Sequence, residues 1–152
     1  MRAPPFWFDA EHSHAAAGVF LVTRDGRVAL QLRDDIPGIA HPGKVTCFGG
    51  SAERGETPVE CALRELAEET GIQASPGALR FLKSISYTDF RGNRTACVFY
   101  WLADVDPAAL RVTEGRAVIL SFEEAALDPR LTDTSRALSQ RISEIVGELR
   151  ER

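Results

Sequence analysis

The sequence has no apolar run long enough to cross a bilayer and no N-terminal signal of the secretory type. Asp9 and Glu11 interrupt its first eighteen residues, "MRAPPFWFDAEHSHAAAG", where a secretory signal requires an uninterrupted apolar stretch. These two absences argue against a membrane-spanning or exported protein. We therefore expect a cytoplasmic protein with no membrane partner.

Cysteine is scarce, and the three residues of this type are widely spaced with no CxxC pair; they are Cys47, Cys61 and Cys97. An odd number at such spacing argues against a disulfide framework or a structural zinc site, so we expect buried, reduced thiols. The pair His12 and His14 in "HSH" has a metal-ligating side-chain type, but one such pair near a terminus is more typical of a solvated tail.

Basic residues are not in excess, since 18 Lys and Arg face 22 Asp and Glu for a net charge of −4. Residues 49–72, "GGSAERGETPVECALRELAEETGI", contain six glutamates and two arginines and so carry the entire imbalance. A chain without a basic stripe is poorly suited to grip nucleic acid through its phosphates, and we expect no nucleic-acid partner. The six glutamates are Glu53, Glu56, Glu60, Glu65, Glu68 and Glu69.

The length of 152 residues and the 44% of hydrophobic residues are typical of one compact domain. No internal repeat or interdomain linker is present, so we expect a single domain over residues 1–152 with an N-terminal extension at 1–15. The aromatic "PPFWF" in this extension would cover either a partner in a homodimer or the protein's own sheet, and the sequence leaves both open.

The expected strands and helices alternate in a way that favours a mixed sheet covered by helices. Residues 15–35 predict a β-hairpin, because Asp25-Gly26 is a strong turn signal between two apolar runs. "VTCF" at 45–48 predicts a short strand that leads into a turn at Gly49-Gly50. Further strands are predicted at 78–89, 94–105 and 115–122, a short helix at 121–127 and a longer one at 133–152.

A helix with well-marked ends is predicted after the double glycine. Thr57 is its expected N-cap, Pro58 takes the first helical position, and Glu60 completes a capping box. Gly71 is placed to end it. Such a cap stabilises a helix by about 1 kcal/mol, so the start of this helix is well defined.

Three glutamates of this helix, Glu65, Glu68 and Glu69, share one face by their spacing. A helical projection places the residues of the opposite, core-facing side as Val59, Ala62, Leu63, Leu66, Ala67 and Thr70. Like charges at this spacing destabilise an isolated helix by a few tenths of a kcal/mol per pair, roughly. One interpretation is a solvated face screened by Arg64.

The other interpretation is a metal site. The double glycine allows close backbone approach, and Glu56 in the preceding loop is able to fold back toward the same face. Arg64 lies next to the acidic group in the sequence rather than within it, so we expect a metal ion to cancel the repulsion. Carboxylate and carbonyl oxygens suit Mg²⁺ or Mn²⁺.

The stretch from Gly50 to Ile72 resembles the Nudix box, G-x5-E-x7-R-E-U-x-E-E-x-G-U, in which U is a bulky aliphatic residue. Every specified position matches, namely Gly50, Glu56, Arg64, Glu65, Leu66, Glu68, Glu69, Gly71 and Ile72. The resemblance implies the Nudix fold, an α/β/α sandwich with a mixed β-sheet. It also implies an enzyme, a pyrophosphohydrolase that uses water to attack a phosphorus of a nucleoside diphosphate linked to another group.

The same resemblance implies a set of ligands for Mg²⁺, with Mn²⁺ as the alternative. Glu65 and Glu69 are the implied principal ligands, and Glu68 is either a further ligand or the general base. The carbonyl of Gly49 is an implied additional ligand, since it precedes the glycine of the box. Glu56 is expected to act through a water molecule or a more weakly held ion.

Arg64 is expected to orient the glutamates by ion pairing, and a contact with a substrate phosphate is the other interpretation. Some Nudix enzymes take their base from a loop beyond the box. Here the candidates are Glu114, Glu123 and Glu124, and the sequence does not choose among them.

The residues expected to contact the substrate are Arg33, Phe48 and Tyr87. Arg33 ends a predicted strand at a position where related enzymes often place an arginine on the phosphates, although it reads equally well as an exposed strand end. Phe48 stands where many relatives have proline, and Val45 where they often have tryptophan. Tyr87 and Phe90 are placed either to stack on a base or sugar or to pack in the fold.

The expected substrate is a small nucleoside diphosphate derivative, either a nucleotide sugar or a nucleoside triphosphate, including an oxidised one. The sequence lacks the marker arrays of the NADH-cleaving and ADP-ribose-cleaving members. The alternatives are a Nudix-fold module that binds a nucleotide without cleaving it and an acidic interaction protein without a metal. Intact box glutamates weigh against both.

Overall fold

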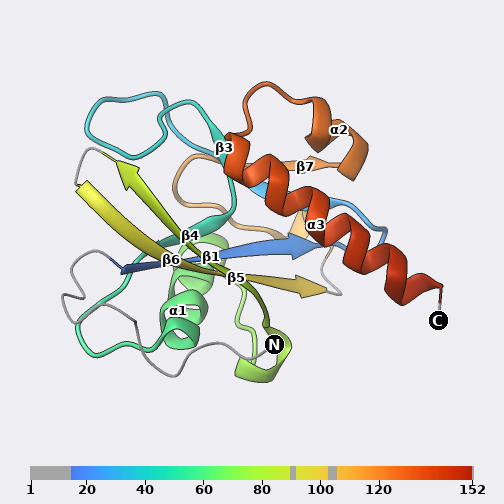
Figure 1. Ribbon diagram of the computed structural model, residues 1–152, viewed down its shortest axis with the longest axis horizontal. Coiled ribbons are helices and arrows are strands. Elements are labelled where there is room, and N and C mark those ends of the chain that lie inside the picture. Colours follow the sequence, from blue (N-terminus) through green and yellow to red (C-terminus); the bar gives the residue numbers. More distant parts are fainter. Residues whose placement is uncertain (1–14, 90–91, 103–105, 152) are drawn as a thin grey trace.

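The computed structural model describes residues 15–89, 92–102 and 106–151. Residues 1–14, with His12, His14 and the aromatic "PPFWF", lie outside this part, as does Phe90. The described chain forms one mixed sheet with helices on both faces, which confirms the predicted α/β class (Figure 1). None of the described helices combines the length and apolarity needed to span a bilayer.

The strands are β1 Ala15–Val22, β2 Val28–Leu32, β3 Val45–Thr46, β4 Phe48–Ser51, β5 Arg80–Asp89, β6 Gly92–Leu102 and β7 Arg116–Leu120. The α-helices are α1 Pro58–Thr70, α2 Phe122–Leu127 and α3 Asp133–Arg150, with short 3₁₀ turns at Pro76–Ala78 and Pro107–Ala109. The predicted elements are therefore present, with bounds shifted by a few residues.

The sheet has the order β3-β2-β1-β6-β5, with β4 also paired to β1 and β7 to β2. Only the β1–β6 pair is parallel among the described strands. The predicted hairpin joins β1 to β2, and Gly26 in its turn has a φ of 81°. That left-handed conformation is why the turn requires glycine.

The central strand β1 is buried on both sides and divides the core in two. Ala17, Val19 and Leu21 point to the face that α1 covers, where they pack with Leu66. Phe20 and Val22 point to the face that α2 and α3 cover. This alternation is the period of a β-strand, and it fixes the register of every neighbouring strand.

Both predicted ends of α1 are confirmed. The Thr57 side chain accepts a hydrogen bond from the backbone N–H of Glu60, and the Glu60 side chain accepts one from the backbone N–H of Thr57. Gly71 ends the helix with a φ of 76°, and its N–H donates to the carbonyl of Ala67. The helix that carries the acidic side chains therefore starts and stops where its local sequence dictates.

The prediction of a turn at Gly49-Gly50 was wrong, because both glycines lie inside β4. Strand β4 pairs with β1 so that Gly49 faces Gly18, and the chain breaks instead at Cys47, between β3 and β4. A Cβ atom on Gly49 would lie 2.0 Å from the carbonyl oxygen of Ala17. Glycine is needed here for close approach of two strands, not for a turn.

Candidate active site

Arg64 lies at the centre of the acidic cluster. Its Nε and Nη2 atoms donate to the two carboxylate oxygens of Glu56 at 2.6 and 2.9 Å. Its Nη1 donates to Glu65 at 3.0 Å and to Glu68 at 3.2 Å, and Nη2 also donates to the carbonyl of Ser51 at 2.9 Å. One guanidinium thus joins three of the box glutamates to strand β4.

This network corrects the expectation that the arginine stands outside the acidic group. The guanidinium screens the glutamates itself, and only 22% of the Arg64 side chain is exposed. Its hydrogen bonds lower the pKa of Glu56, and the carboxylate of Glu56 in turn raises the pKa of Arg64. Arg64 therefore cancels much of the repulsion that we expected a metal ion to cancel.

Glu69 is buried, with 4% of its surface exposed. Its Oε1 atom accepts a hydrogen bond of 2.9 Å from the N–H of Gly49, whereas Oε2 is buried without any hydrogen-bond partner. Burial raises the pKa of Glu69 to about 7, and the charge of Glu65 adds to the rise. Burial also raises the pKa of Glu65, although Arg64 opposes the shift.

The interpretation of a solvated face therefore fails for Glu69, which is buried beside Glu65. The loop that follows the 3₁₀ turn at Pro107–Ala109 runs along the end of α1 and helps to cover it. In that loop the N–H of Thr113 donates to the carbonyl of Glu69 at 3.4 Å, and the Thr113 hydroxyl donates to the carbonyl of Glu68 at 3.1 Å. The projection treats α1 alone and cannot include this long-range contact.

The three loop candidates for a base fall in different places. Glu114 belongs to the loop beside α1, and its negative charge contributes to the raised pKa values of both Glu65 and Glu69. Glu124 instead closes a capping box with Ser121 at the start of α2, and Glu123 lies in the same helical turn. Of these three glutamates, Glu114 is therefore the one that lies close enough to Glu65 and Glu69 to influence their charge.

Gln31 is a site residue that the sequence reading missed. It is fully buried in β2, and its Nε2 donates to the carbonyl of Glu114 at 2.8 Å. The Gln31 side chain also opposes the rise in the pKa of Glu69, although its amide makes no hydrogen bond with Oε2. A polar residue in the apolar strand "VALQL" was the available signal, because a buried amide needs partners.

Arg33 braces the loop that follows β2. Its Nε donates to the carbonyl of Ala40 at 3.0 Å, and its Nη1 lies 3.4 Å from Oε1 of Gln31. Arg33 also lines a pocket of about 550 Å³ that adjoins Gly49, Gly50 and Ser51. Arg33 can therefore stabilise the loop and line the pocket at the same time.

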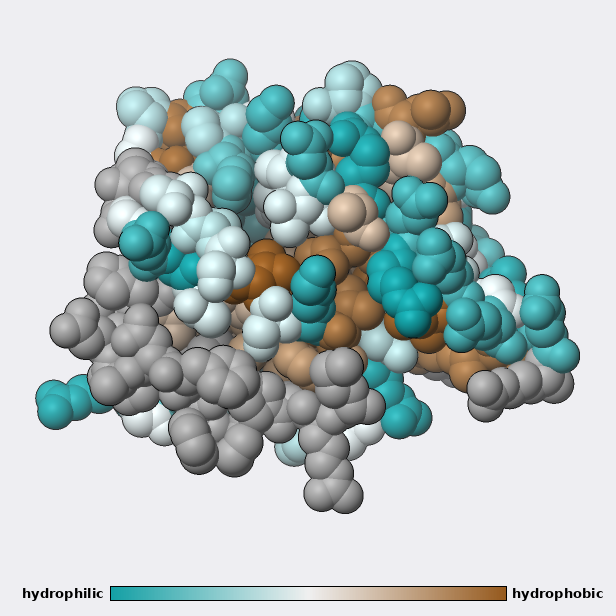
Figure 2. Space-filling view, in the orientation of Figure 1, coloured by the Kyte–Doolittle hydropathy of each residue, from teal (hydrophilic) through white to brown (hydrophobic). Residues whose placement is uncertain are grey.

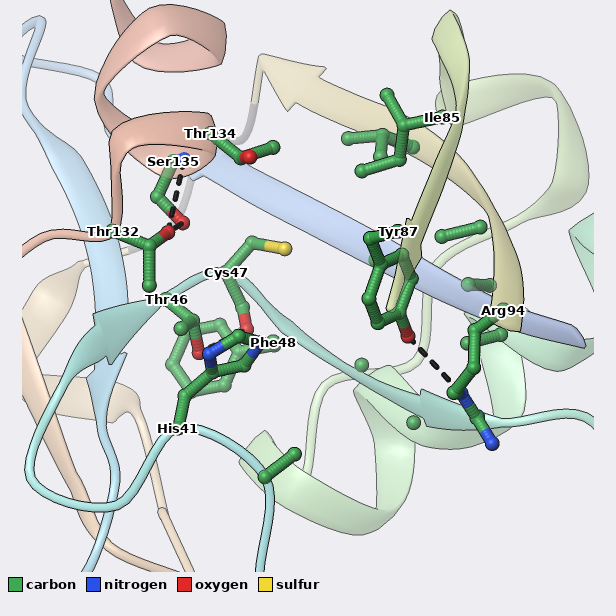
Figure 3. Close-up of a pocket in the computed structure, with 18 of the residues that line it drawn as sticks. His41, Thr46, Cys47, Phe48, Ile85, Tyr87, Arg94, Thr132, Thr134 and Ser135 are labelled. Atoms are coloured by element: carbon green, nitrogen blue, oxygen red, sulfur yellow. Dashed lines mark hydrogen bonds between the residues drawn. The ribbon is translucent and has the colours of Figure 1, made fainter. Parts of the chain in front are cut away.

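The pocket lies on the α3 side of the sheet, where Figure 2 shows apolar surface in the middle of the face with hydrophilic surface around it. Tyr87 and the unpredicted residues His41 and Arg94 line it (Figure 3). Phe48 forms part of its floor but is fully buried and packs in the core. We therefore assign the ring of Phe48 to the core and not to substrate contact.

The missing side chain of Gly50 leaves space for the carboxylate of Glu65. A Cβ atom at this position would lie 2.6 Å from Cδ of Glu65 and 2.7 Å from both of its oxygens. We expect Gly50→Ala to cost less than about 1 kcal/mol of stability, because the end of a flexible side chain can shift. We expect turnover to fall about tenfold or more, because Glu65 is an implied metal ligand and its carboxylate would be displaced.

Thermal unfolding and steady-state kinetics of Gly50→Ala check this prediction. Gly77→Ala is the matched control, since a Cβ atom on Gly77 meets no atom within 4 Å. Equal kinetics in the two variants would show that Glu65 needs no such space.

Comparisons with known proteins agree with the fold and with the box. The NUDIX domain family matches residues 12–142. The solved structure of the MutT protein from Methanosarcina mazei Go1 superposes with a TM-score of 0.73 and 19% identity, over 86% of this chain and 92% of that one. This likeness confirms the Nudix fold.

Two curated proteins align over shorter stretches. The RNA pyrophosphohydrolase of Gluconobacter oxydans (strain 621H) is 41% identical over 56 residues, which span 37% of this chain and 31% of that protein. The uncharacterised Nudix hydrolase orf19 of Rhodococcus erythropolis is 42% identical over 60 residues, 39% of this chain and 32% of that protein. Each alignment spans about a third of the relative's length. The family match spans most of the chain, so the chain belongs to the NUDIX domain family.

Proposed function

We propose that this protein hydrolyses nucleoside diphosphate-linked compounds in a metal-dependent reaction, with water attacking a phosphorus of the diphosphate. The observation that carries the proposal is the buried Oε2 atom of Glu69, which has no hydrogen-bond partner and lies in a site shared with Glu65. An ionised carboxylate is costly to bury without a compensating charge, and a divalent cation would supply it.

The donor set fits a hard cation, Mg²⁺ or alternatively Mn²⁺, because every candidate ligand is an oxygen. Glu65 and Glu69 would hold it, helped by Glu68, Glu56 and the carbonyl of Gly49. When bound, such an ion acidifies a water molecule and neutralises charge on the leaving phosphate. In the part of the chain that the structure describes, no three His, Cys, Asp or Glu side chains already converge on one point.

Arg64 accounts for this arrangement. It holds Glu56, Glu65 and Glu68 by hydrogen bonds, so these side chains surround its guanidinium. These hydrogen bonds support a role of Arg64 in orienting the carboxylates rather than in contacting a substrate phosphate.

The proton of the attacking water has two candidate acceptors. Glu68 is exposed and makes a hydrogen bond to Arg64, while Glu114 is held next to Glu65 and Glu69 by its loop. A general base contributes about 10²- to 10⁴-fold to a rate. Of Glu68→Gln and Glu114→Gln, the variant with the larger loss of turnover identifies the base.

The test is a substrate panel with purified protein, with Mg²⁺, with Mn²⁺ and with a chelator. It contains nucleotide sugars, dinucleoside polyphosphates, ADP-ribose, NADH, coenzyme A, and normal and oxidised nucleoside triphosphates. The RNA pyrophosphohydrolase among the relatives adds an RNA to the panel. We expect cleavage of at least one nucleoside diphosphate derivative, with none in chelator. Nucleotide binding without cleavage of any compound would favour the binding module.

A further inference from the structure

The loop between β2 and β3 presents His41 to the pocket in a constrained conformation. His41 has a φ of 52°, and among the described residues it is the only one other than glycine with a positive φ. The loop is fixed on both sides of it, by Arg33 bonded to the carbonyl of Ala40 and by the N–H of Lys44 bonded to the carbonyl of His41. Left-handed backbone at a non-glycine residue is costly and is often kept where a side chain must be presented.

Tyr87 faces His41 across the same pocket, from strand β5 (Figure 3). The Nε atom of Arg94 donates to the Tyr87 hydroxyl at 3.2 Å, and its Nη2 donates to the Ser51 hydroxyl at 2.7 Å. Only 4% of Arg94 is exposed, so this arginine is a rigid support. The tyrosine ring is thereby held in one orientation. His41 and Tyr87 form two opposite walls of the pocket.

The surface between these two walls suits a flat, uncharged ring. Its side chains are small or apolar, such as Cys47 and Ile85, or carry a hydroxyl, such as Thr46 and Thr134. None of the described residues that line the pocket is Asp, Glu, Asn or Gln. These side chains read the edge of a base by hydrogen bonds. Arginine also reads the edge of a base, but Arg33 donates to the carbonyl of Ala40 and Arg94 donates to Tyr87 and Ser51. Stacking on aromatic faces accepts any base.

The distribution of charged side chains around the pocket favours one orientation of a bound ligand. The pocket contains Arg33 and Arg94 and no acidic side chain, while the acidic box begins where the pocket adjoins Gly49, Gly50 and Ser51. An anionic chain is favoured at this border, near the arginines and any bound cation. The neutral end of the ligand then extends away from β4, between His41 and Tyr87.

We propose that His41 and Tyr87 form a slot that binds the aromatic base of the substrate by stacking, with little preference among bases. The inference rests on the proposed function, because it concerns the base of the same substrate. It makes the slot the source of a broad rather than a selective base specificity.

The experiment measures binding of AMP, GMP, CMP and UMP against ribose 5-phosphate by calorimetry, with Mg²⁺ present. These probes contain no anhydride, so the result does not depend on turnover. We expect each nucleotide to bind about tenfold more tightly than ribose 5-phosphate, with less than about a tenfold spread among the four. A ratio near one, or one base preferred about a hundredfold, overturns the proposal.

Variants assign the effect to the two walls. Tyr87→Leu and His41→Gly should lose most of the advantage of nucleotides while binding ribose 5-phosphate as before, and Tyr87→Phe should keep it. His41→Gly retains the left-handed backbone, so the loop is preserved. Ser86→Ala is the control and should bind all of the probes like the wild type. Ser86 is the exposed residue that precedes Tyr87 in β5.

The outcomes separate this inference from the proposed function. Base-dependent binding in a protein that cleaves nothing would leave the slot intact and refute the hydrolase. Cleavage by a protein that binds ribose 5-phosphate as tightly as the nucleotides would refute the slot and leave the hydrolase. An equal loss of both kinds of probe in Tyr87→Leu would show that Tyr87 supports the fold instead.

Discussion

Glu69→Gln should lower turnover about a thousandfold and at the same time stabilise the metal-free protein. The loss of turnover follows because a metal ion contributes several kcal/mol of charge stabilisation, roughly, and the amide is a poor ligand for it. The gain in stability follows because Oε2 of Glu69 is buried without a hydrogen-bond partner, and an uncharged group is cheaper to bury there.

The gain should depend on pH in a defined direction. Burial raises the pKa of Glu69 to about 7 from its usual 4.5, so the folded protein holds a proton that the unfolded chain releases between these values. The stability from protonated Glu69 is complete below pH 4.5 and is lost as the pH rises through about 7. We expect Glu69→Gln to be more stable than the wild type by up to about 3 kcal/mol near pH 8, and similar near pH 4.

Denaturant unfolding at several pH values, in chelator, measures this difference. Glu65 also has a raised pKa, and its charge adds to the rise at Glu69, so the measured difference includes the repulsion between these two carboxylates. Glu148→Gln removes the same charge from an exposed position of α3 and should change neither stability nor turnover. A Glu69→Gln protein that is less stable than the wild type near pH 8 would contradict our view of Glu69 as a buried charge without compensation.

Arg64→Met should destabilise the metal-free protein by about 2–3 kcal/mol. Removing one member of a buried ion pair costs about 3–5 kcal/mol, and the partial exposure of Arg64 lowers this figure. The loss arises because Glu56, Glu65 and Glu68 would repel one another without the guanidinium between them. Mg²⁺ should restore more stability to this variant than to the wild type, because the cation takes over the compensation.

Unfolding with and without Mg²⁺ provides the measurement. Arg54→Met is the matched control, since Arg54 lies in the same stretch, is exposed, and loses the same charge. Equal stability of the two variants would mean that the contacts of Arg64 contribute nothing. Arg64→Lys should recover only part of the loss, because lysine cannot make the two parallel bonds to Glu56.

The sequence predicted what local interactions determine. The start and end of α1 depend on Thr57, Glu60 and Gly71, which are neighbours in the chain, and the hairpin turn depends on Asp25 and Gly26. The spacing of the box glutamates likewise identified the acidic helix. These features follow from short-range hydrogen bonds and backbone preferences, which the local sequence determines.

The features that the sequence predicted wrongly or did not reveal depend on contacts between distant segments of the chain. Glu69 is buried because β4 and the loop around Thr113 both cover the end of α1. Gly49 lies in a strand because β1 requires close approach at that point. Gln31 joins the site through a carbonyl 83 residues away in the sequence. No local propensity encodes such pairings.

The most direct test of the central claim is hydrolysis of the favoured substrate in water enriched in the heavy oxygen isotope, with the products weighed by mass spectrometry. Attack at phosphorus places one heavy oxygen atom in a phosphate product, only when Mg²⁺ or Mn²⁺ is present, and Glu69→Gln should show almost none. Label in the non-phosphate product, or labelled phosphate formed equally well in chelator, would contradict a metal-dependent attack of water on the diphosphate.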